Sequence, residues 1–306
     1  MPPTPTTESI PTGPPVFITG APKSGKSALL DVFRQLPGFH AVQEPLSTWK
    51  IGAHRRENDR RTAQDATDAL VRSIRADIAR QCHSVGATRY VEDLSHHALQ
   101  LPFLRAVFPE ARVVVVTRHP REFLPEAYYF WTLKPSVART ARLRRKSLTL
   151  KTFPSMAYRF AKNVISSHWR GRLNTWGAIV PGQKEFARAH SVMELASYQW
   201  AKLYECLLED AARDPVGVHL VSIEDLRDRP RETIAQTLEF CRIPVTDEIL
   251  SFAEKHFNPD FHFPKRIELS EAEWKSAQKI VRDTAFRLGY EMRLCQLGEM
   301  QGPVKP

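Results

Sequence analysis

One stretch near the start of the chain, Gly20-Ala-Pro-Lys-Ser-Gly-Lys-Ser27, constrains the fold more than any other. It follows a short apolar run, Val16–Thr19, and precedes a segment with helical spacing from about residue 27 to 36. Gly20 and Gly25 allow the backbone to turn sharply and to approach a ligand closely. The residues fit G-x-x-x-x-G-K-[ST], the pattern of a phosphate-binding loop, and the strand and helix that this pattern requires flank it. The stretch therefore predicts a ligand that carries phosphate.

The side chains of this loop are suited to an anion. Backbone N–H groups at a helix N-terminus attract negative charge, Lys23 and Lys26 add two positive charges, and Ser24 and Ser27 add hydroxyl donors. The competing interpretation is an ordinary strand-to-helix turn with solvated lysines. Motif and context together favour the phosphate site.

Alternation of strand-like and helix-like segments predicts the fold class. The four valines at 113–116 are typical of a strand buried on both faces, as in parallel sheets. We expect an α/β, three-layer, P-loop-type fold with a central, mainly parallel sheet flanked by helices. The expected strands are 16–19, 38–44, a third that begins at 89 and leads into the polar residues before 97, 112–118 and 218–223. The expected helices are 27–36, 63–83, 99–108, 191–211, 231–241, 245–256 and 271–288.

The chain has no internal repeat and no low-complexity linker, so one domain is expected. We predict a disordered arm at 1–14, a single domain at 15–293 and a mobile tail at 294–306. No apolar run approaches the ~20 residues of a membrane span, and the start of the chain lacks a basic-then-apolar signal. A cytoplasmic location is therefore expected. The four cysteines are scattered without metal-ligand spacing, and we expect no metal.

The formal net charge of +10 favours an anionic partner, but no nucleic-acid-binding signature accompanies it. Much of the charge lies in a basic, helical insertion at 139–190, in which aromatic residues are interleaved. This insertion could be a lid or an acceptor-binding element, a solvated helical excursion, or a surface for an anionic partner.

Polar residues follow several predicted strands, where ligands bind in open α/β sheets. Glu44 precedes Pro45, which disfavours helix at Glu44. His96 and His97 follow the third strand, and Arg118 follows the fourth. An arginine there can donate two parallel hydrogen bonds to a phosphate. The alternatives are a solvated carboxylate, structural histidines and a surface arginine.

Five landmarks resemble, in order, the sulfotransferases that use 3′-phosphoadenosine 5′-phosphosulfate (PAPS). Pro22-Lys-Ser-Gly25 is similar to their 5′-phosphosulfate loop, and Phe108-Pro-Glu-Ala-Arg-Val-Val-Val-Val-Thr-Arg118-His-Pro-Arg121 resembles their 3′-phosphate strand and turn. Ile223-Glu-Asp-Leu226 with Pro230, and Leu288-Gly-Tyr290, resemble C-terminal signatures. Trp176-Gly177 and Pro181-Gly182 ahead of Trp200 resemble the bacterial, carbohydrate-type branch.

The resemblance implies transfer of a sulfuryl group from PAPS to a hydroxyl or amine of a small-molecule, carbohydrate or peptide acceptor. Lys23 would contact the bridging oxygen and the sulfonate. Arg118 would bind the 3′-phosphate. The cofactor-binding set that the resemblance implies comprises Pro22, Lys23, Ser24, Gly25, Lys26, Ser27, Arg118, Lys265 and Arg266.

Three residues are candidates for the base that accepts the acceptor's proton. His96 lies 22 residues before Arg118, where a catalytic histidine stands in one branch of the family, and histidine titrates near neutrality. Other branches use a glutamate, and Glu44 before Pro45 resembles that arrangement. We prefer His96, with Glu44 next and His97 third.

Three departures from the family pattern leave other functions open, and one of them is Leu94, which stands where a Lys often precedes the histidine site. Lys26 stands where the family has Thr or Ser, and it completes a nucleoside-triphosphate pattern, so a P-loop kinase using ATP and Mg²⁺ is the alternative. That reaction needs an acidic residue at a strand end, for which Asp93 is the candidate. Glu126 replaces a serine and would repel a 3′-phosphate by ~4 kcal/mol unless it points away or pairs with Lys or Arg. A catalytically weak nucleotide-binding protein is the third possibility.

Overall fold

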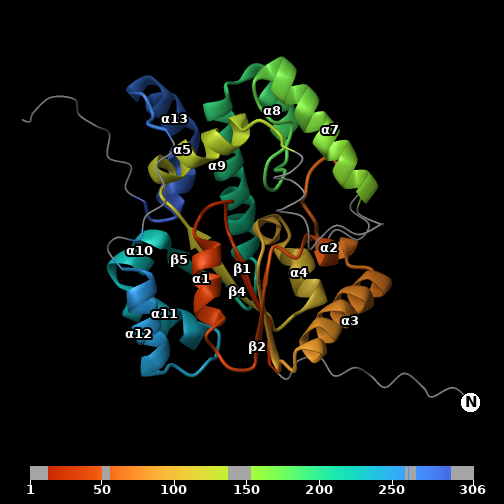
Figure 1. Ribbon diagram of the computed structural model, residues 1–306, viewed down its shortest axis with the longest axis vertical. Coiled ribbons are helices and arrows are strands. Elements are labelled where there is room, and N and C mark those ends of the chain that lie inside the picture. The colour runs from red at the N-terminus through yellow and green to blue at the C-terminus, as the bar shows by residue number, and fades with distance from the viewer. Residues whose placement is uncertain (1–12, 50–55, 137–152, 259–260, 262–266, 291–306) are drawn as a thin grey trace, which may run out of the picture.

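The computed structural model describes residues 13–49, 56–136, 153–258, 261 and 267–290. Its centre is a five-stranded sheet in the order β2-β3-β1-β4-β5, and every neighbouring pair is parallel. Helices cover both faces of this sheet (Figure 1). The predicted three-layer α/β fold with a parallel sheet is confirmed.

The strands lie where the apolar runs of the sequence predict them, to within a few residues. The strands are β1 (Val16–Thr19), β2 (Phe39–Gln43), β3 (Arg89–Asp93), β4 (Arg112–Thr117) and β5 (His219–Ser222). The α-helices are α1 (Lys26–Phe33), α2 (Leu46–Trp49), α3 (Asp68–Ser84), α4 (Leu101–Val107), α5 (Pro120–Thr132), α7 (Phe153–Arg170), α8 (Gln183–Ala189), α9 (Val192–Ala211), α10 (Ile223–Asp228), α11 (Pro230–Phe240), α12 (Asp247–His256) and α13 (Glu271–Arg287). Two 3₁₀ helices, η1 (Ala63–Asp65) and η2 (Ser95–Leu99), complete the described elements.

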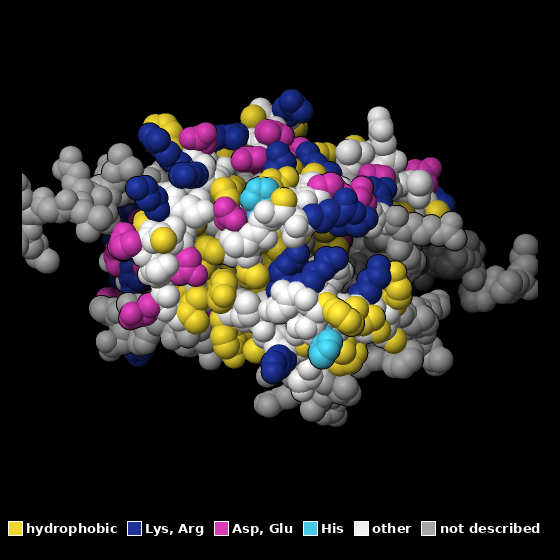
Figure 2. All heavy atoms as spheres, turned by 90° about the horizontal axis from the view of Figure 1, so that it is seen from above, with side chains coloured by type: hydrophobic (Ala, Val, Ile, Leu, Met, Phe, Trp, Pro, Cys, Tyr) yellow, Lys and Arg dark blue, Asp and Glu magenta, His cyan; other side chains and the backbone are white. Residues whose placement is uncertain are grey.

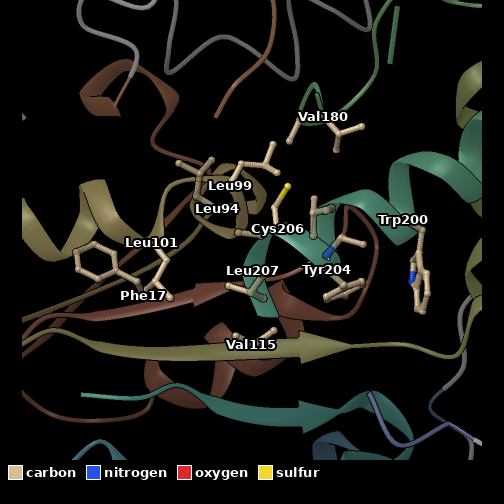
Figure 3. Packing of buried hydrophobic residues seen from close by; sticks show 14 of the residues in the cluster. Phe17, Leu94, Leu99, Leu101, Val115, Val180, Trp200, Tyr204, Cys206 and Leu207 are labelled. Carbon is tan, nitrogen blue, oxygen red and sulfur yellow. Dashed lines mark hydrogen bonds between the residues drawn. The ribbon is translucent and has the colours of Figure 1, made fainter. Parts of the chain in front are cut away.

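Alternate residues of each strand enter two separate cores. Phe17 and Val115 face one core, which α3, α4, α5, α9 and α13 cover, whereas Ile18 and Val114 face the other, which α1, α10, α11 and α12 cover. This alternation is the period of two that a pleated strand imposes. Because both faces are buried, the run of valines in β4 needs no polar residue, as expected. Figure 3 shows the first core, in which Leu207 and Tyr204 of α9 lie against Val115.

The sheet order places three turns side by side. β1 lies between β3 and β4, with Ile18 opposite Asp93 on one side and Val114 on the other. Since all the strands are parallel, the turns after β1, β3 and β4 leave the same edge of the sheet. Candidate site residues that are up to 100 positions apart in sequence are brought to this edge by strand register.

Two predicted elements differ in detail from the structure. The helix expected at 63–83 is divided, since η1 ends at Asp65 and α3 begins at Asp68 with the Thr67 hydroxyl capping its first turn. Within the predicted insertion, the described residues form α7 and α8, whereas 137–152 lie outside the described residues. Most of the predicted arm and tail also lies outside them. No helix in the described part of the chain is both long and apolar enough to cross a bilayer.

Candidate phosphate-binding site

The turn after β1 is a narrow loop in which glycine is required. Gly20 has a φ of 135°, and a Cβ at this position would lie 2.1 Å from the backbone oxygen of Val116. Such a contact is impossible without moving the neighbouring strand. Gly25, at the start of α1, has a φ of 102°, and Lys23 between them has a φ of 65°. Left-handed conformations at these positions let the loop curl back over the end of the sheet.

Lys26 lies inside this curl. Its side chain is only 6% exposed, and its ammonium donates to the backbone oxygen of Ala21 over 2.7 Å. Burial lowers the pKa of Lys26 to about 8, while the negative charges of Asp93 and Glu44 act in the opposite direction. A phosphate bound in the loop would stabilise the charged form of the Lys26 ammonium, as an anion near a buried cation does.

The Ser27 hydroxyl is held by two residues from neighbouring strands. It donates to Asp93 Oδ2 at 2.7 Å and accepts from Gln43 Nε2 at 2.8 Å. Asp93 is 1% exposed at the end of β3, and its other oxygen accepts the backbone N–H of Glu44 at 3.0 Å. The carboxylate thus joins the helix start to the turn after β2. Asp93, considered from the sequence only as a metal ligand, is here a positioning residue for Ser27, and Gln43 was not predicted at all.

Lys23 of the loop and Arg118 of the turn after β4 are in contact. The Lys23 ammonium lies over the ring of Phe130 in α5, 4.4 Å from its centroid, in a cation–π arrangement. Its backbone oxygen accepts from Arg118 Nη1 at 3.1 Å. The loop and the turn after β4, predicted to bind two different phosphates, are therefore in direct contact.

Arg118 is paired with the residue that departs from the family pattern. Arg118 Nη1 lies 2.9 Å from Oε2 of Glu126, a residue of α5. Arg118 Nε lies 3.7 Å from Oε2 of Glu122, in the first turn of the same helix. Arg118 and Glu126 are 4% and 5% exposed. Of the two conditions under which Glu126 would not repel a phosphate, the structure shows the second, a pair with an arginine.

The two C-terminal signatures support the same turn. The Tyr290 hydroxyl lies 2.8 Å from Thr117 Oγ1 and 3.1 Å from Glu224, whose other oxygen accepts the His119 backbone N–H at 2.9 Å. Burial raises the pKa of Glu224 above its usual value. Glu224 and Tyr290 thus hold the His119 backbone and the Thr117 side chain, one on each side of Arg118, which sequence spacing could not reveal.

The three candidate bases lie in different environments. Glu44 is exposed, has a φ of 47°, and stands close enough to Lys26 to influence its pKa. His96 is 7% exposed, with its Nε2 3.4 Å from Asp59 Oδ2, beside a cavity of about 10 Å³. That volume is close to the minimum for one water. Access therefore favours Glu44 over His96.

His97 lies in the apolar core. Its Nε2 is 2.5 Å from Glu92, and its ring packs edge-on against Trp49 and Phe17. Glu92 also accepts from the Tyr90 hydroxyl at 2.5 Å. All three polar residues of this cluster are at most 1% exposed. This is the environment of a structural histidine that satisfies a buried carboxylate.

The remaining predictions are partly outside the described residues. Pro22, Ser24 and Gly25 lie in the loop, with Ser24 fully buried, whereas Lys265 and Arg266 lie outside the residues that the structure describes.

Among the described residues no cluster of three or more His, Cys, Asp or Glu is suited to a metal ion. The fold and the loop together define an α/β protein whose turn after β1 carries the sequence pattern of a phosphate-binding loop.

Comparison with known proteins supports the resemblance. Residues 14–152 match the model of the Sulfotransferase family, a span that contains the phosphate-binding loop, β4 and Arg118. The resemblance expected from the motifs is confirmed for this part of the chain. No curated protein matches the sequence.

Solved sulfotransferases are similar at low identity. The sulfotransferase domain from the curacin biosynthetic pathway is 14% identical, with 91% of this chain and 98% of that chain covered at a TM-score of 0.47. A sulfotransferase from Alicyclobacillus acidocaldarius is 16% identical, with 91% and 97% covered at 0.48. A mouse sulfotransferase complexed with PAP is 10% identical, with 89% and 84% covered at 0.47.

Proposed function

We propose that this protein transfers a sulfuryl group from PAPS to a hydroxyl or amine acceptor. The observation that carries the proposal is the contact between Arg118 and the backbone oxygen of Lys23, within the span that matches the Sulfotransferase family. This contact brings an arginine beside the phosphate-binding loop, as a donor nucleotide with phosphates at both its 5′ and 3′ positions requires.

The residues of the loop fit such a donor. The loop turns tightly at Gly20 and leads into the N-terminus of a helix, and Lys26 carries a positive charge whose burial an anion would offset. The Lys23 side chain extends over the Phe130 ring, and its ammonium can stabilise the negative charge that develops on the leaving phosphate. PAPS supplies the activated sulfuryl group, and this chain supplies binding, orientation and charge stabilisation.

We assign proton acceptance to Glu44, with His96 as the second candidate. Glu44 is exposed at the edge of the sheet that carries the loop, so an acceptor hydroxyl can approach it. The acceptor oxygen forms a bond to sulfur while the bond from sulfur to the 5′-phosphate oxygen breaks, and the acceptor's proton passes to the carboxylate. His96 would require the small cavity beside Asp59 to open.

The donor assignment is tested by thermal-shift titration with 3′,5′-ADP and, separately, with ATP–Mg²⁺. A ligand at about 100 times its Kd stabilises a fold by ~2.7 kcal/mol, which gives a readable shift. We expect stabilisation by 3′,5′-ADP that Arg118→Ala removes and that Arg121→Ala, a change at the same turn, retains. Stabilisation by ATP–Mg²⁺ alone would overturn the proposal, since Ser27 and Asp93 could then serve a metal.

The base is tested by single-turnover transfer of labelled sulfate from PAPS to a panel of alcohols and amines. Glu44→Gln keeps the shape of the side chain and removes its basicity, and we expect a loss of about 10²–10⁴-fold in rate with little change in 3′,5′-ADP affinity. His96→Gln is the matched comparison. A normal rate in Glu44→Gln together with a large loss in His96→Gln would transfer the assignment to His96.

A further inference from the structure

The helix α7 packs on the protein through its polar side. Asn163 accepts the backbone N–H groups of Asn174 and Thr175 at 2.9 and 3.0 Å, and its amide donates to the Thr175 oxygen at 3.2 Å. Ser166, one turn further on, is buried. A helix on the surface of a globular protein ordinarily turns its apolar side to the core. Here the side chains that anchor the helix are an amide and a hydroxyl.

The apolar side of α7 faces outward. Tyr158, Ile165 and Trp169 are 60%, 59% and 81% exposed. Their spacing of seven and then four residues places them on one face of the helix. Lys162 lies on the same face, with its ammonium 4.6 Å from the centroid of the Tyr158 ring. We name these four residues the α7 outer face.

The α7 outer face differs from other exposed apolar residues of the described chain. Val85, Leu220 and Phe286 are also exposed, but they lie apart from one another and from α7, and Val164 of α7 is 43% exposed on another side of that helix. Single exposed apolar residues are common and need no explanation. Three together on one convex helix face, two of them aromatic, mark an interaction surface.

The segment of sequence that contains α7 is strongly basic, which favours an anionic partner. Residues 127–184 contain twelve Lys and Arg and no Asp or Glu, whereas the whole chain has a net charge of +10. All of the net positive charge therefore lies in this segment, and the rest of the chain is slightly acidic. In Figure 2, which looks onto the end of the molecule where α7 lies, yellow and blue side chains share the lower right, while magenta side chains gather on the left and along the upper rim.

We propose that the α7 outer face binds an anionic lipid bilayer, with α7 lying in the plane of the membrane surface. Tyr and Trp rings are enriched at the boundary between headgroups and acyl chains, because one end is apolar and the other polar. A lysine beside them can bury its stem and keep its ammonium at the headgroups. Basic amphipathic helices with exposed aromatic residues bind such surfaces through apolar burial and electrostatic attraction together.

The test is co-sedimentation of the full-length protein with phosphatidylcholine vesicles, with and without about one-third phosphatidylserine. We expect binding to the anionic vesicles that falls as salt is raised, and little binding to phosphatidylcholine alone. Trp169→Ser should weaken binding about tenfold, because it removes most of an aromatic side chain that the bilayer would bury. Lys162→Glu should weaken it by a similar factor, since it replaces an attraction by a repulsion.

Phe286→Ser is the control for an exposed aromatic residue elsewhere, because Phe286 of α13 is 79% exposed and lies outside residues 127–184, beside Arg282, Asp283 and Arg287. It should leave vesicle binding unchanged. The melting temperature of each variant establishes that it is folded. The proposal is overturned by equal binding to both vesicle types, by equal losses in Trp169→Ser and Phe286→Ser, or by binding to an acidic polypeptide without binding to vesicles. These results do not depend on the nucleotide chemistry of the loop.

Discussion

The guanidinium of Arg118 and the carboxylate of Glu126 form a buried ion pair, with 2.9 Å between Nη1 and Oε2. The arginine predicted to bind a 3′-phosphate thus already has a negative partner. A phosphate arriving at this site must compete with the carboxylate or join it. If a nucleotide with a 3′-phosphate binds at Arg118 as proposed, we expect this pair to weaken its binding.

Replacement of Glu126 should expose this competition. Removing one partner of a buried pair leaves the other charge without compensation, so Glu126→Ser should lower the free energy of unfolding of the ligand-free protein by on the order of 3 kcal/mol. The same change should increase the stabilisation by 3′,5′-ADP, because the phosphate then replaces the lost carboxylate. Urea denaturation with and without the nucleotide measures both effects.

Glu122→Ser is the control for this prediction. Glu122 lies 3.7 Å from Arg118 Nε, but its side chain is 42% exposed. Exposed pairs contribute little, so we expect a change below about 1 kcal/mol and an unaltered nucleotide response. A nucleotide response that is the same in Glu126→Ser and in the wild type would contradict the competition.

The buried Lys26 should make stability depend on pH. Its pKa is about 8 in the folded protein and near 10.5 when exposed on unfolding. Between these values the unfolded state binds more protons, so the contribution of Lys26 to the free energy of unfolding rises with pH. Across the window the rise is on the order of 3 kcal/mol. Denaturation of wild type and Lys26→Met at several pH values isolates it as their difference, which should be constant below about pH 8 and above about pH 10.5. A difference that is constant throughout would refute the shift.

Gly20 should tolerate no side chain. A Cβ there would overlap the backbone oxygen of Val116 at 2.1 Å, so Gly20→Ala must distort β4 or the loop. We expect a loss of more than about 3 kcal/mol in unfolding free energy, and a loss of nucleotide binding. Gly86→Ala is the control, because Gly86 has a φ of 66° with no atom within 4 Å of the added carbon. Its cost should be about 1–2 kcal/mol, for the left-handed conformation alone. Equal losses in the two variants would contradict the tight contact.

His97 should affect stability rather than catalysis. His97→Ala leaves the Glu92 carboxylate buried with Tyr90 as its remaining hydrogen-bond partner and creates a cavity beside Trp49. We expect a destabilisation on the order of 3 kcal/mol, measured by urea denaturation. At a temperature at which the variant is folded, its transfer rate should be close to that of the wild type. A large loss of rate with unchanged stability would return His97 to the candidate bases.

Much of the fold follows from short-range patterns. Four consecutive valines predicted the buried strand β4, and the glycines of the loop predicted the turn between Thr19 and Lys26. Even the breaks in helices had local signals, such as the hydroxyl of Thr67 before α3. The division into η1 and α3 was missed because the helical spacing continues across it.

Of the candidate site, the sequence predicted the loop but not the residues that its side chains contact. Its loop is one contiguous segment, so its motif identified it. The partners of its side chains come from other strands and helices, and their identity depends on register. Asp93 reaches Ser27 because β3 pairs with β1 with Asp93 opposite Ile18, and no spacing within either segment reveals that pairing.

The sequence alone determined the order of the elements, the phosphate-binding loop and the concentration of positive charge between residues 127 and 184, because these depend on neighbouring residues and composition. Only the tertiary structure decided that Glu126 pairs with Arg118, that His97 lies in the core while Glu44 is exposed, and that α7 turns its aromatic residues outward. Each of these depends on which distant surfaces pack together. Packing is decided by the whole set of buried contacts, and not by the pattern of any one segment.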